Sequence, residues 1–333
     1  MHKQMKKILV LVLVMSQLVF IVGCTKEEET VEMDKVTFIL DWLPNTNHTG
    51  IYSAIEKGYF SDVNIQVEVI QPSEGDANTL VATGQGEFGV SFQESLSMAR
   101  TAENPIPIIA IAAIIQNNTS GFAGLTESNI KSPKDFEGKI YGSWGTEIET
   151  AFIKTMMEKE NADVEKLEVI DIVSYDFLTS ITNDVDFQWI YYGWDGIAAE
   201  EKGVDISFIK LQDIDERLNF YTPIIITSET LIEEDPDLVK RFLSAATKGY
   251  EYVAANPEEA VKDLLKHAPE TDVDIATASQ IYLADEFIAD SKGWGYMEDS
   301  IWTTFSDWMF ENGVIAKELD VEKAYTNEFL PKK

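Results

Sequence analysis

The sequence predicts an α/β protein of two domains, and three observations lead to this prediction. Short strand-like runs alternate with helical patterns along the first two thirds of the chain, which is typical of a mostly parallel α/β architecture. From Asp237 onward the pattern is almost wholly helical, so these helices need a sheet that is already formed. About 300 residues also exceed what one hydrophobic core usually holds.

Strands are expected where β-branched and aromatic residues cluster or alternate with polar ones, and helices where apolar residues recur every three or four positions. The predicted strands are 36–40, 65–69, 88–92, 106–115, 139–141, 168–173, 187–191, 206–211 and 223–227. The predicted helices are 52–58, 77–84, 94–101, 147–160, 175–182, 195–201, 238–254, 257–266, 275–284 and 297–311.

The first residues have the pattern of a secretory signal peptide. Three lysines precede an apolar run over 8–22, which is short for a membrane-spanning helix. The sequence at 21–24 then resembles a bacterial lipobox, and Cys24 is the only cysteine of the chain. We therefore expect cleavage after 1–23, lipidation of Cys24, a polar tether over 24–35, and anchoring on the outer face of the cell membrane. The alternative is an ordinary signal peptide with an incidental cysteine.

The chain is expected to leave its first domain and return to it. The late helices have no strands of their own, so lobe 1 is predicted to comprise 36–122 and 226–333, and lobe 2 to comprise 123–225. The ligand cleft would lie between the lobes. The two crossings, near 122–126 and 221–226, would form the hinge.

The composition is strongly acidic, with 58 Asp and Glu against 26 Lys and Arg and a formal net charge of -32. Loss of the signal peptide would remove three of these 26 basic residues and no acidic residue, so the mature chain would be more acidic still. Such a charge repels nucleic acid and anionic lipid head groups, so nucleic acid is not an expected partner. A covalent lipid is a more plausible link to the membrane than a basic patch.

Five loops at the ends of predicted strands are rich in aromatic and amide residues and contain neither Lys nor Arg. These loops are 42–50, 91–95, 116–121, 142–147 and 189–195. In open α/β sheets, ligands bind at this edge. Sites for sulfonate, nitrate or phosphate commonly use Arg or Lys, although helix N-termini alone can bind anions. The loops therefore favour a neutral or cationic ligand, and flat aromatic ligands suit the tryptophans best.

The candidate ligand contacts are the polar and aromatic side chains of these loops. They are Trp42, Asn45, Asn47, His48, Gln93, Glu94, Asn117, Thr119, Ser120, Trp144, Glu147, Tyr192, Trp194 and Asp195. Structural roles are the alternative: the polar cluster before Gly50 could cap a helix, and Glu94 and Glu147 begin helices, where a carboxylate is favoured. In the aromatic cluster, we expect Trp189 or Tyr191 to be structural, because alternate residues of a strand face a core.

No catalytic or metal-binding motif accompanies these candidates, and no catalytic residue, metal or cofactor is predicted. His48 is the only histidine in the five loops, the chain has no Gly-x-Ser-x-Gly, and His267 is distant in sequence. A surface enzyme that uses His48 with Glu94 or Glu147 as acid and base is therefore the less favoured hypothesis.

The segments 42–50, 56–60, 116–122 and 191–196 resemble a bacterial family of solute-binding lipoproteins. Proteins of this family serve ABC importers of thiamine pyrimidine precursors, and the likeness extends over nearly all of 36–315. It implies a type II periplasmic-binding fold, in which two α/β lobes close on a ligand such as formylaminopyrimidine or hydroxymethylpyrimidine.

The resemblance also implies the partners. The expected role is that of a monomeric receptor that delivers a small pyrimidine to an ABC permease and its ATPase. Other branches bind riboflavin, taurine, alkanesulfonates or nitrate, so another small solute is the alternative ligand. Fungal relatives are enzymes that make the pyrimidine with an iron-binding cysteine cluster. Because Cys24 is the only cysteine here, an enzyme of that kind is not expected.

Overall fold

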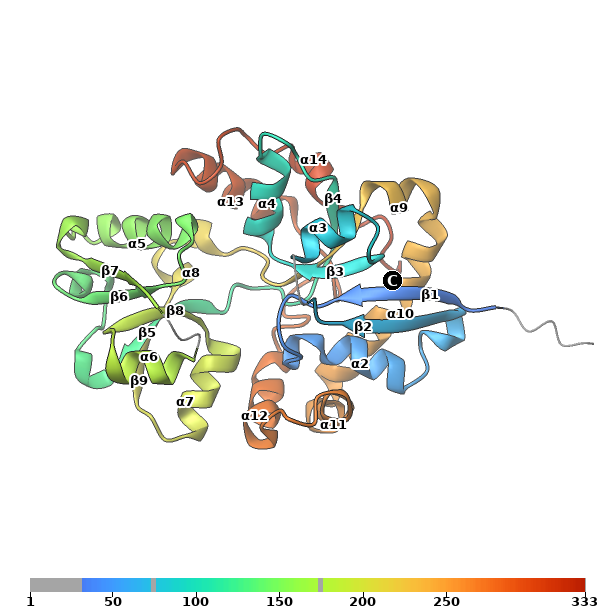
Figure 1. Ribbon diagram of the computed structural model, residues 1–333, viewed down its shortest axis with the longest axis horizontal. Helices are drawn as coiled ribbons and strands as arrows, with labels where there is room; N and C mark the ends of the chain where they lie inside the picture. Colours follow the sequence, from blue (N-terminus) through green and yellow to red (C-terminus); the bar gives the residue numbers. More distant parts are fainter. Residues whose placement is uncertain (1–31, 73–75, 173–175, 333) are drawn as a thin grey trace, which may run out of the picture. The chain divides into compact units, whose positions relative to one another are not determined.

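Two five-stranded sheets, each packed against helices, organise the computed structural model, which describes residues 32–72, 76–172 and 176–332 (Figure 1). The first sheet has the order β2(Ile65–Ile70)-β1(Asp34–Ile39)-β3(Phe88–Ser91)-β10(Ile224–Ser228)-β4(Ile108–Ala113). The second has the order β7(Glu168–Asp171)-β6(Ile140–Ser143)-β8(Phe187–Tyr191)-β5(Ser120–Leu125)-β9(Ile206–Lys210). The predicted α/β class is confirmed.

The two sheets share one topology, and both are mixed rather than simply parallel. β1 pairs in parallel with β2 and β3, whereas β10 is antiparallel to β3 and β4. In the second sheet β6 pairs in parallel with β7 and β8, and β5 is antiparallel to β8 and β9. In each sheet the antiparallel strand directly follows a crossing of the chain from one sheet to the other. β5 follows the crossing from the first sheet to the second, and β10 follows the return to the first.

The helices have the following bounds, with η6 denoting a π-helix and η1 a 3-10 turn. They are η1(Thr46–His48), α2(Thr49–Glu56), α3(Ala77–Ala82), α4(Gln93–Thr101), α5(Glu147–Lys159), α6(Phe177–Asn183), η6(Tyr192–Gly196), α7(Ile197–Glu201), α8(Leu211–Ile214), α9(Glu229–Glu234), α10(Pro236–Ala255), α11(Pro257–His267), α12(Val273–Ala284), α13(Asp299–Glu311) and α14(Val321–Ala324). Several helices begin after a residue whose side chain caps the helix N-terminus. Asp235 accepts a bond from the Leu238 amide before α10, and Asp272 caps α12 in the same way.

Every predicted strand and long helix is present in the described residues, with shifts of a few residues at the ends. The short α8, α9 and α14 were not predicted, nor was strand β5. β5 contains two glycines, which are poor strand formers. A Cβ atom at Gly121 would come within 2.3 Å of the Ile209 carbonyl oxygen, and one at Gly124 within 2.2 Å of that of Asp186. The neighbouring backbone therefore leaves room only for glycine at these two positions. The same two glycines are the reason why the sequence did not predict β5.

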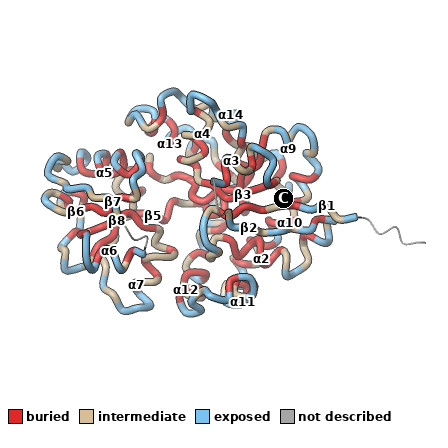
Figure 2. Tube along the Cα trace, in the orientation of Figure 1, coloured by how far each residue is buried: buried red, intermediate tan, exposed pale blue. Residues whose placement is uncertain are grey.

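Each sheet carries a core on both faces, as alternation along the strands requires (Figure 2). In the first sheet, Phe38 faces α2 and α10, whereas the next residue, Ile39, faces α3 and α4. In the second, Phe122 faces α5 and Ala123 faces α6. Both sheets are therefore covered on two sides.

Helix α13 belongs to the cores of both sheets. Its Trp302 packs with the first sheet, but Phe305 and Trp308 lie in the core cluster of the second. Trp308 stacks on Phe152 of α5 with ring centroids 5.2 Å apart, and its Nε1 donates to Thr155 Oγ1 at 3.1 Å. The assignment of all of 226–333 to lobe 1 did not anticipate this packing.

The crossings between the sheets run side by side. The Asn118 amide donates to Asn219 Oδ1 at 2.9 Å, and Asn118 Nδ2 donates to the Leu218 carbonyl at 2.8 Å. The predicted boundaries at 122/123 and 225/226 fall inside β5 and β10. The division into two lobes that close about these crossings stays a prediction.

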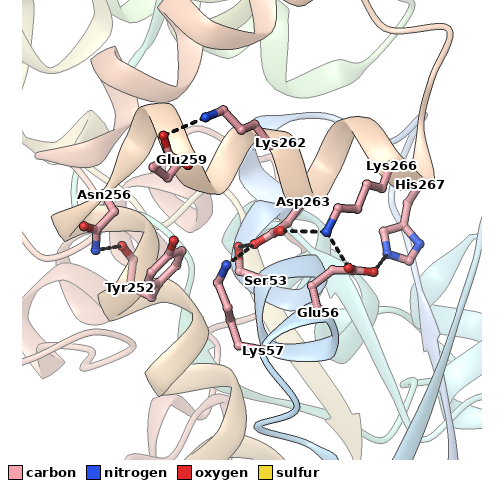
Figure 3. Close-up of polar contacts among 10 residues, drawn as sticks. All are labelled: Ser53, Glu56, Lys57, Tyr252, Asn256, Glu259, Lys262, Asp263, Lys266 and His267. Atoms are coloured by element: carbon pink, nitrogen blue, oxygen red, sulfur yellow. Dashed lines mark hydrogen bonds and ion pairs between the residues drawn. The ribbon is translucent and has the colours of Figure 1, made fainter.

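A polar network holds α11 on α2 (Figure 3). The buried Asp263 carboxylate accepts a bond from Ser53 Oγ at 3.0 Å and pairs with Lys57 Nζ at 3.4 Å. At the edge of the network, Lys266 Nζ and His267 Nε2 lie 2.6 and 2.9 Å from the two carboxylate oxygens of Glu56. Because α12 packs against α11, this network also supports α12.

The signal peptide, lipidated Cys24 and residues 24–31 of the tether lie outside the described residues and stay predictions. Within the described ranges, no helix combines the length and the apolar character needed to cross a membrane.

Candidate ligand site

The loop after β1 is held by its own side chains. Asn45 caps η1, because its Oδ1 accepts from the Asn47 amide at 3.0 Å. The Asn45 amide donates to His48 Nδ1 at 3.1 Å, so the proton of the ring is on Nε2, which donates to Asp41 Oδ1 at 2.7 Å. His48 is fully buried and both of its nitrogens are bonded within the chain. We therefore reassign His48 from ligand contact to positioning of the loop.

A small pocket opens beside this loop, with an empty volume of about 270 Å³ that includes the part open to solvent. Its walls come from loops of both sheets, from the crossings and from α12. The lining residues are Thr46, Asn47, Ile115, Thr119, Tyr191, Gly193, Trp194, Thr222 and Leu283. Three predicted contacts, Asn47, Thr119 and Trp194, are thus brought together, and none of the lining residues is basic.

The charges of three carboxyl groups act on the Tyr191 hydroxyl. Burial raises the pKa of the Tyr191 hydroxyl well above its usual value, and the charges of Glu94, Asp41 and Asp195 raise it further. Of the two aromatic residues of which at least one is expected to be structural, Trp189 lies in the core of the second sheet, whereas Tyr191 lines the pocket. Its hydroxyl is 3.5 Å from Thr222 Oγ1.

Glu94 is the most unusual of these carboxyl groups. It lies in the first turn of α4 with only 5 % of its surface exposed, and Oε2 has no hydrogen-bond partner among the described residues. Burial raises its pKa to about 8, and burial raises that of Asp195 to about 7. At pH 7 the Glu94 carboxyl is therefore mostly protonated, and it can both donate and accept a hydrogen bond.

Further buried polar atoms in the candidate loops have no partner within the described residues. They are Asn47 Oδ1, Thr49 Oγ1, Gln93 Nε2, Gln116 Nε2 and Trp189 Nε1. Buried polar groups are normally hydrogen-bonded, and groups that are not call for an explanation. Gln93 shows how such a group arises, because its Oε1 accepts from the Tyr221 amide at 2.8 Å and fixes the side chain while Nε2 stays free. The loops thus hold both donors and acceptors without a partner among the described residues, and Asn47 is the one of these residues that lines the pocket.

Aromatic rings form one side of the site. Trp144 lies 6.3 Å from Tyr191 and 5.3 Å from Trp189 between ring centroids. The position of Trp144 depends on Glu149, a fully buried carboxylate that accepts from the Trp144 amide at 3.0 Å and from the Tyr141 hydroxyl at 2.6 Å. The predicted Glu147 is exposed instead. Thr146 and Glu149 have the spacing of a capping box, a signal that would have identified the correct glutamate.

Of the predicted contacts, only Asn47, Thr119 and Trp194 line the pocket. The lining residues do not include Gln93, Glu94, Trp144, Glu147 or Asp195, and the remaining candidates are absent from them too. Trp42 is 56 % exposed, and Asn45 serves as a cap. Asn117 bonds with Glu286 and Asn219, and Ser120 bonds with Asn118. The ring of Tyr192 contacts those of Phe208 and Tyr282, and its hydroxyl donates to Glu200. Their roles as ligand contacts stay predictions.

A second hollow, of about 940 Å³ by the same measure, lies apart from these loops. It is formed by α10 and the segments 292–296 and 330–331, and it includes Lys248 and Lys292. It contains none of the predicted contacts, and its lining includes lysines, which the lining of the small pocket lacks. Its greater volume therefore does not make it the better candidate. In the described parts of the chain, no group of three or more His, Cys, Asp or Glu side chains is arranged to hold a metal.

Known proteins resemble most of this chain in sequence. Residues 45–260 match the model of the family described as NMT1/THI5 like. The formylaminopyrimidine-binding protein of Halalkalibacterium halodurans is 25% identical over 303 residues, which cover 89% of this chain and 90% of the relative. The 4-amino-5-hydroxymethyl-2-methylpyrimidine phosphate synthase of Candida albicans is 24% identical, over 89% of this chain and 88% of the synthase.

Among solved structures, the periplasmic aliphatic sulphonate binding protein SsuA of Escherichia coli has a TM-score of 0.67 at 11% identity. The match covers 90% of this chain and 94% of that protein. At this identity the likeness concerns the fold alone, and it confirms the predicted periplasmic-binding-protein fold.

Proposed function

Since the chain belongs to the NMT1/THI5-like family, we propose that it is the substrate-binding lipoprotein of an ABC importer and captures a thiamine pyrimidine precursor. The precursor would be of the formylaminopyrimidine or hydroxymethylpyrimidine type. The observation that carries the proposal is the buried Glu94 carboxyl, whose Oε2 has no partner among the described residues. Glu94 is not one of the lining residues, but its charge acts on the hydroxyl of Tyr191, which is one.

An aminopyrimidine edge has a donor, the amino group, beside an acceptor, the ring nitrogen. A protonated carboxyl group has the complementary pair, and it forms two hydrogen bonds with such an edge. The raised pKa of Glu94, about 8, keeps the carboxyl protonated at neutral pH. A ligand that lacks the donor leaves the Glu94 carbonyl oxygen unpaired, which supports selection of aminopyrimidines.

The aromatic side of the site suits a flat heterocycle. The rings of Tyr191 and Trp194 line the pocket, and Trp144 lies beside Tyr191. Stacking of a base on one such ring contributes roughly 1–3 kcal/mol. The absence of Lys and Arg from the lining favours a neutral or cationic heterocycle over a sulfonate or phosphate.

Binding without turnover is the proposed activity. His48 was the candidate acid or base, and both of its ring nitrogens are engaged with Asn45 and Asp41. Transport requires only that ligand binding favours the closed arrangement of the lobes, which then docks on a permease. Lipid on Cys24 would keep the receptor at the outer face of the membrane, near that permease.

A thermal-shift panel of the mature protein tests this proposal. Formylaminopyrimidine and hydroxymethylpyrimidine are expected to raise the melting temperature, because a ligand that binds only the folded state stabilises it. Riboflavin, taurine and an alkanesulfonate serve as the competing candidates. Stabilisation by one of these and not by either pyrimidine would refute the assigned ligand. Chromatographic recovery of an altered pyrimidine would refute binding without turnover.

A further inference from the structure

A chain of two hydroxyl groups joins the loop after β1 to the end of β8 through helix α12. Thr46 Oγ1 and Ser279 Oγ are 2.6 Å apart, and Ser279 Oγ also bonds to the Gly193 carbonyl oxygen. Thr46 and Ser279 are both fully buried. Thr46 and Gly193 line the pocket from the loops of different sheets, and Ser279 lies between them.

Chemistry fixes the direction of both hydrogen bonds. A carbonyl oxygen can only accept, so the single proton of Ser279 is donated to Gly193. Ser279 Oγ can then only accept from Thr46, which uses the single proton of the Thr46 hydroxyl. The hydroxyl of Thr46 is left with lone pairs alone, and toward the pocket it can act only as an acceptor.

We infer that Ser279 is a specificity-determining residue, which makes Thr46 an obligate acceptor and so selects ligands that present a donor to this wall. The inference rests on the proposed function and deepens it, because an amino group is such a donor and a carbonyl oxygen is not. Ser279 acts through Thr46 and is a positioning residue. An oxo group at this point would meet the lone pairs of Thr46 Oγ1, and the Thr46 hydroxyl has no proton left to donate to it.

Other contacts hold α12 in register with the end of β8. The rings of Tyr282 and Tyr192 have centroids 5.5 Å apart. Leu283 packs so close to Gly193 that a Cβ atom there would lie 2.9 Å from Leu283 Cδ2. Leu283 itself lines the pocket. Ser279 is therefore placed by a helix that is part of the site.

The test is the selectivity of the protein between 4-amino-2-methylpyrimidine and its 4-oxo counterpart, measured by calorimetry. Ser279→Ala frees the Thr46 proton, so the ratio of the two affinities should fall by about tenfold, the effect of roughly one hydrogen bond. Thr277→Ala is the matched control, because Thr277 Oγ1 donates to the Val273 carbonyl of the same helix at 2.7 Å. The control should leave the ratio unchanged.

A purely structural role for Ser279 predicts a different result. Loosening of α12 would weaken both ligands equally and leave their ratio at the wild-type value, and this outcome would overturn the inference. In a Thr46→Val background, Ser279→Ala should no longer change the ratio, because the hydroxyl that it controls is gone. A change of equal size in that background would also overturn it.

A measurement without ligand separates this inference from the proposed function. The melting temperatures of Thr46→Val, Ser279→Ala and the double variant form a cycle in which the two hydroxyls should couple, so the double variant melts higher than additivity predicts. Strict additivity overturns the hydroxyl chain whether or not a pyrimidine binds. Coupled hydroxyls in a wild-type protein that binds neither pyrimidine would uphold the chain and refute the proposed function.

Discussion

Replacing Glu94 with glutamine isolates the role of the proton that the carboxyl group holds. Glutamine has nearly the same shape and retains one donor side and one acceptor, but it does not titrate. The pKa of Glu94, about 8, means that wild-type protein binds an aminopyrimidine without proton uptake at neutral pH. Above pH 8 the free carboxyl has lost its proton, so binding must take one up, and affinity should fall by about tenfold per pH unit.

The assay is calorimetric titration of hydroxymethylpyrimidine between pH 6.5 and 9.5, in two buffers with different ionisation enthalpies to count protons. Glu94→Gln should lose the roughly tenfold fall in affinity per unit above pH 8, because its amide does not titrate. Glu94→Leu, which removes both hydrogen bonds and leaves the ligand donor unpaired, should lose about 2–4 kcal/mol, or roughly 30- to 1000-fold. The exposed Glu103→Gln is the control. A Glu94→Gln variant that follows the wild-type pH profile would show that the proton on Glu94 does not control binding.

The same proton affects stability without ligand, and the sign follows from the direction of the shift. Burial raises the pKa of Glu94 from 4.5 to about 8, so the folded state binds more protons than the unfolded state in this interval. Its contribution to stability is present below pH 4.5 and is lost as pH rises toward 8, by at most about 1.4 kcal/mol per pH unit. Glu94→Gln should flatten this decline in urea unfolding at pH 5, 6.5 and 8, and an unchanged decline would contradict the assignment.

Three further substitutions test separate parts of the account. Trp194→Ala should weaken pyrimidine binding by about 1–3 kcal/mol with an unchanged melting temperature, and undiminished calorimetric affinity would remove Trp194 from the site. Glu149→Ala should lower both the ligand affinity and the melting temperature, because it frees the loop that holds Trp144. Glu158→Ala, at an exposed position of the same helix, should change neither, and effects of equal size in the two variants would contradict the anchoring role of Glu149. Asp263→Ala should cost about 2–4 kcal/mol in urea unfolding, because it leaves Ser53 and the α2–α11 contact without their buried acceptor, and a change under 0.5 kcal/mol would refute that role.

The sequence predicted most of the fold because its strands and helices carry strong local signals. Alternation in β2 and the capping Asp235 of α10 are visible without any tertiary information. β5 was missed because Gly121 and Gly124 are selected by the approach of the neighbouring strands, and such an approach has no local signature. The same holds for α13, whose apolar face gave no sign that it would pack on two cores.

The candidate pocket lies among the predicted loops, but only some of the predicted residues line it. Strand ends and the absence of basic residues led to Asn47, Thr119, Trp194 and the buried Glu94. The role of His48 could not be predicted, because it depends on which nitrogen meets Asp41.

For a related reason, the sequence did not place Tyr191, Thr46 or helix α12 in the candidate site. Each reaches the site through contacts between segments far apart in the chain, such as the bond between Thr46 and Ser279.

Calorimetric titration of the mature protein with hydroxymethylpyrimidine and formylaminopyrimidine, followed by chromatography of the recovered ligand, shows whether the protein is a receptor for these pyrimidines. We expect saturable binding of at least one of them, with the ligand recovered unchanged, and no comparable binding of riboflavin or taurine. Failure of both pyrimidines to bind while one of the other solutes does, or recovery of a converted pyrimidine, would contradict this expectation.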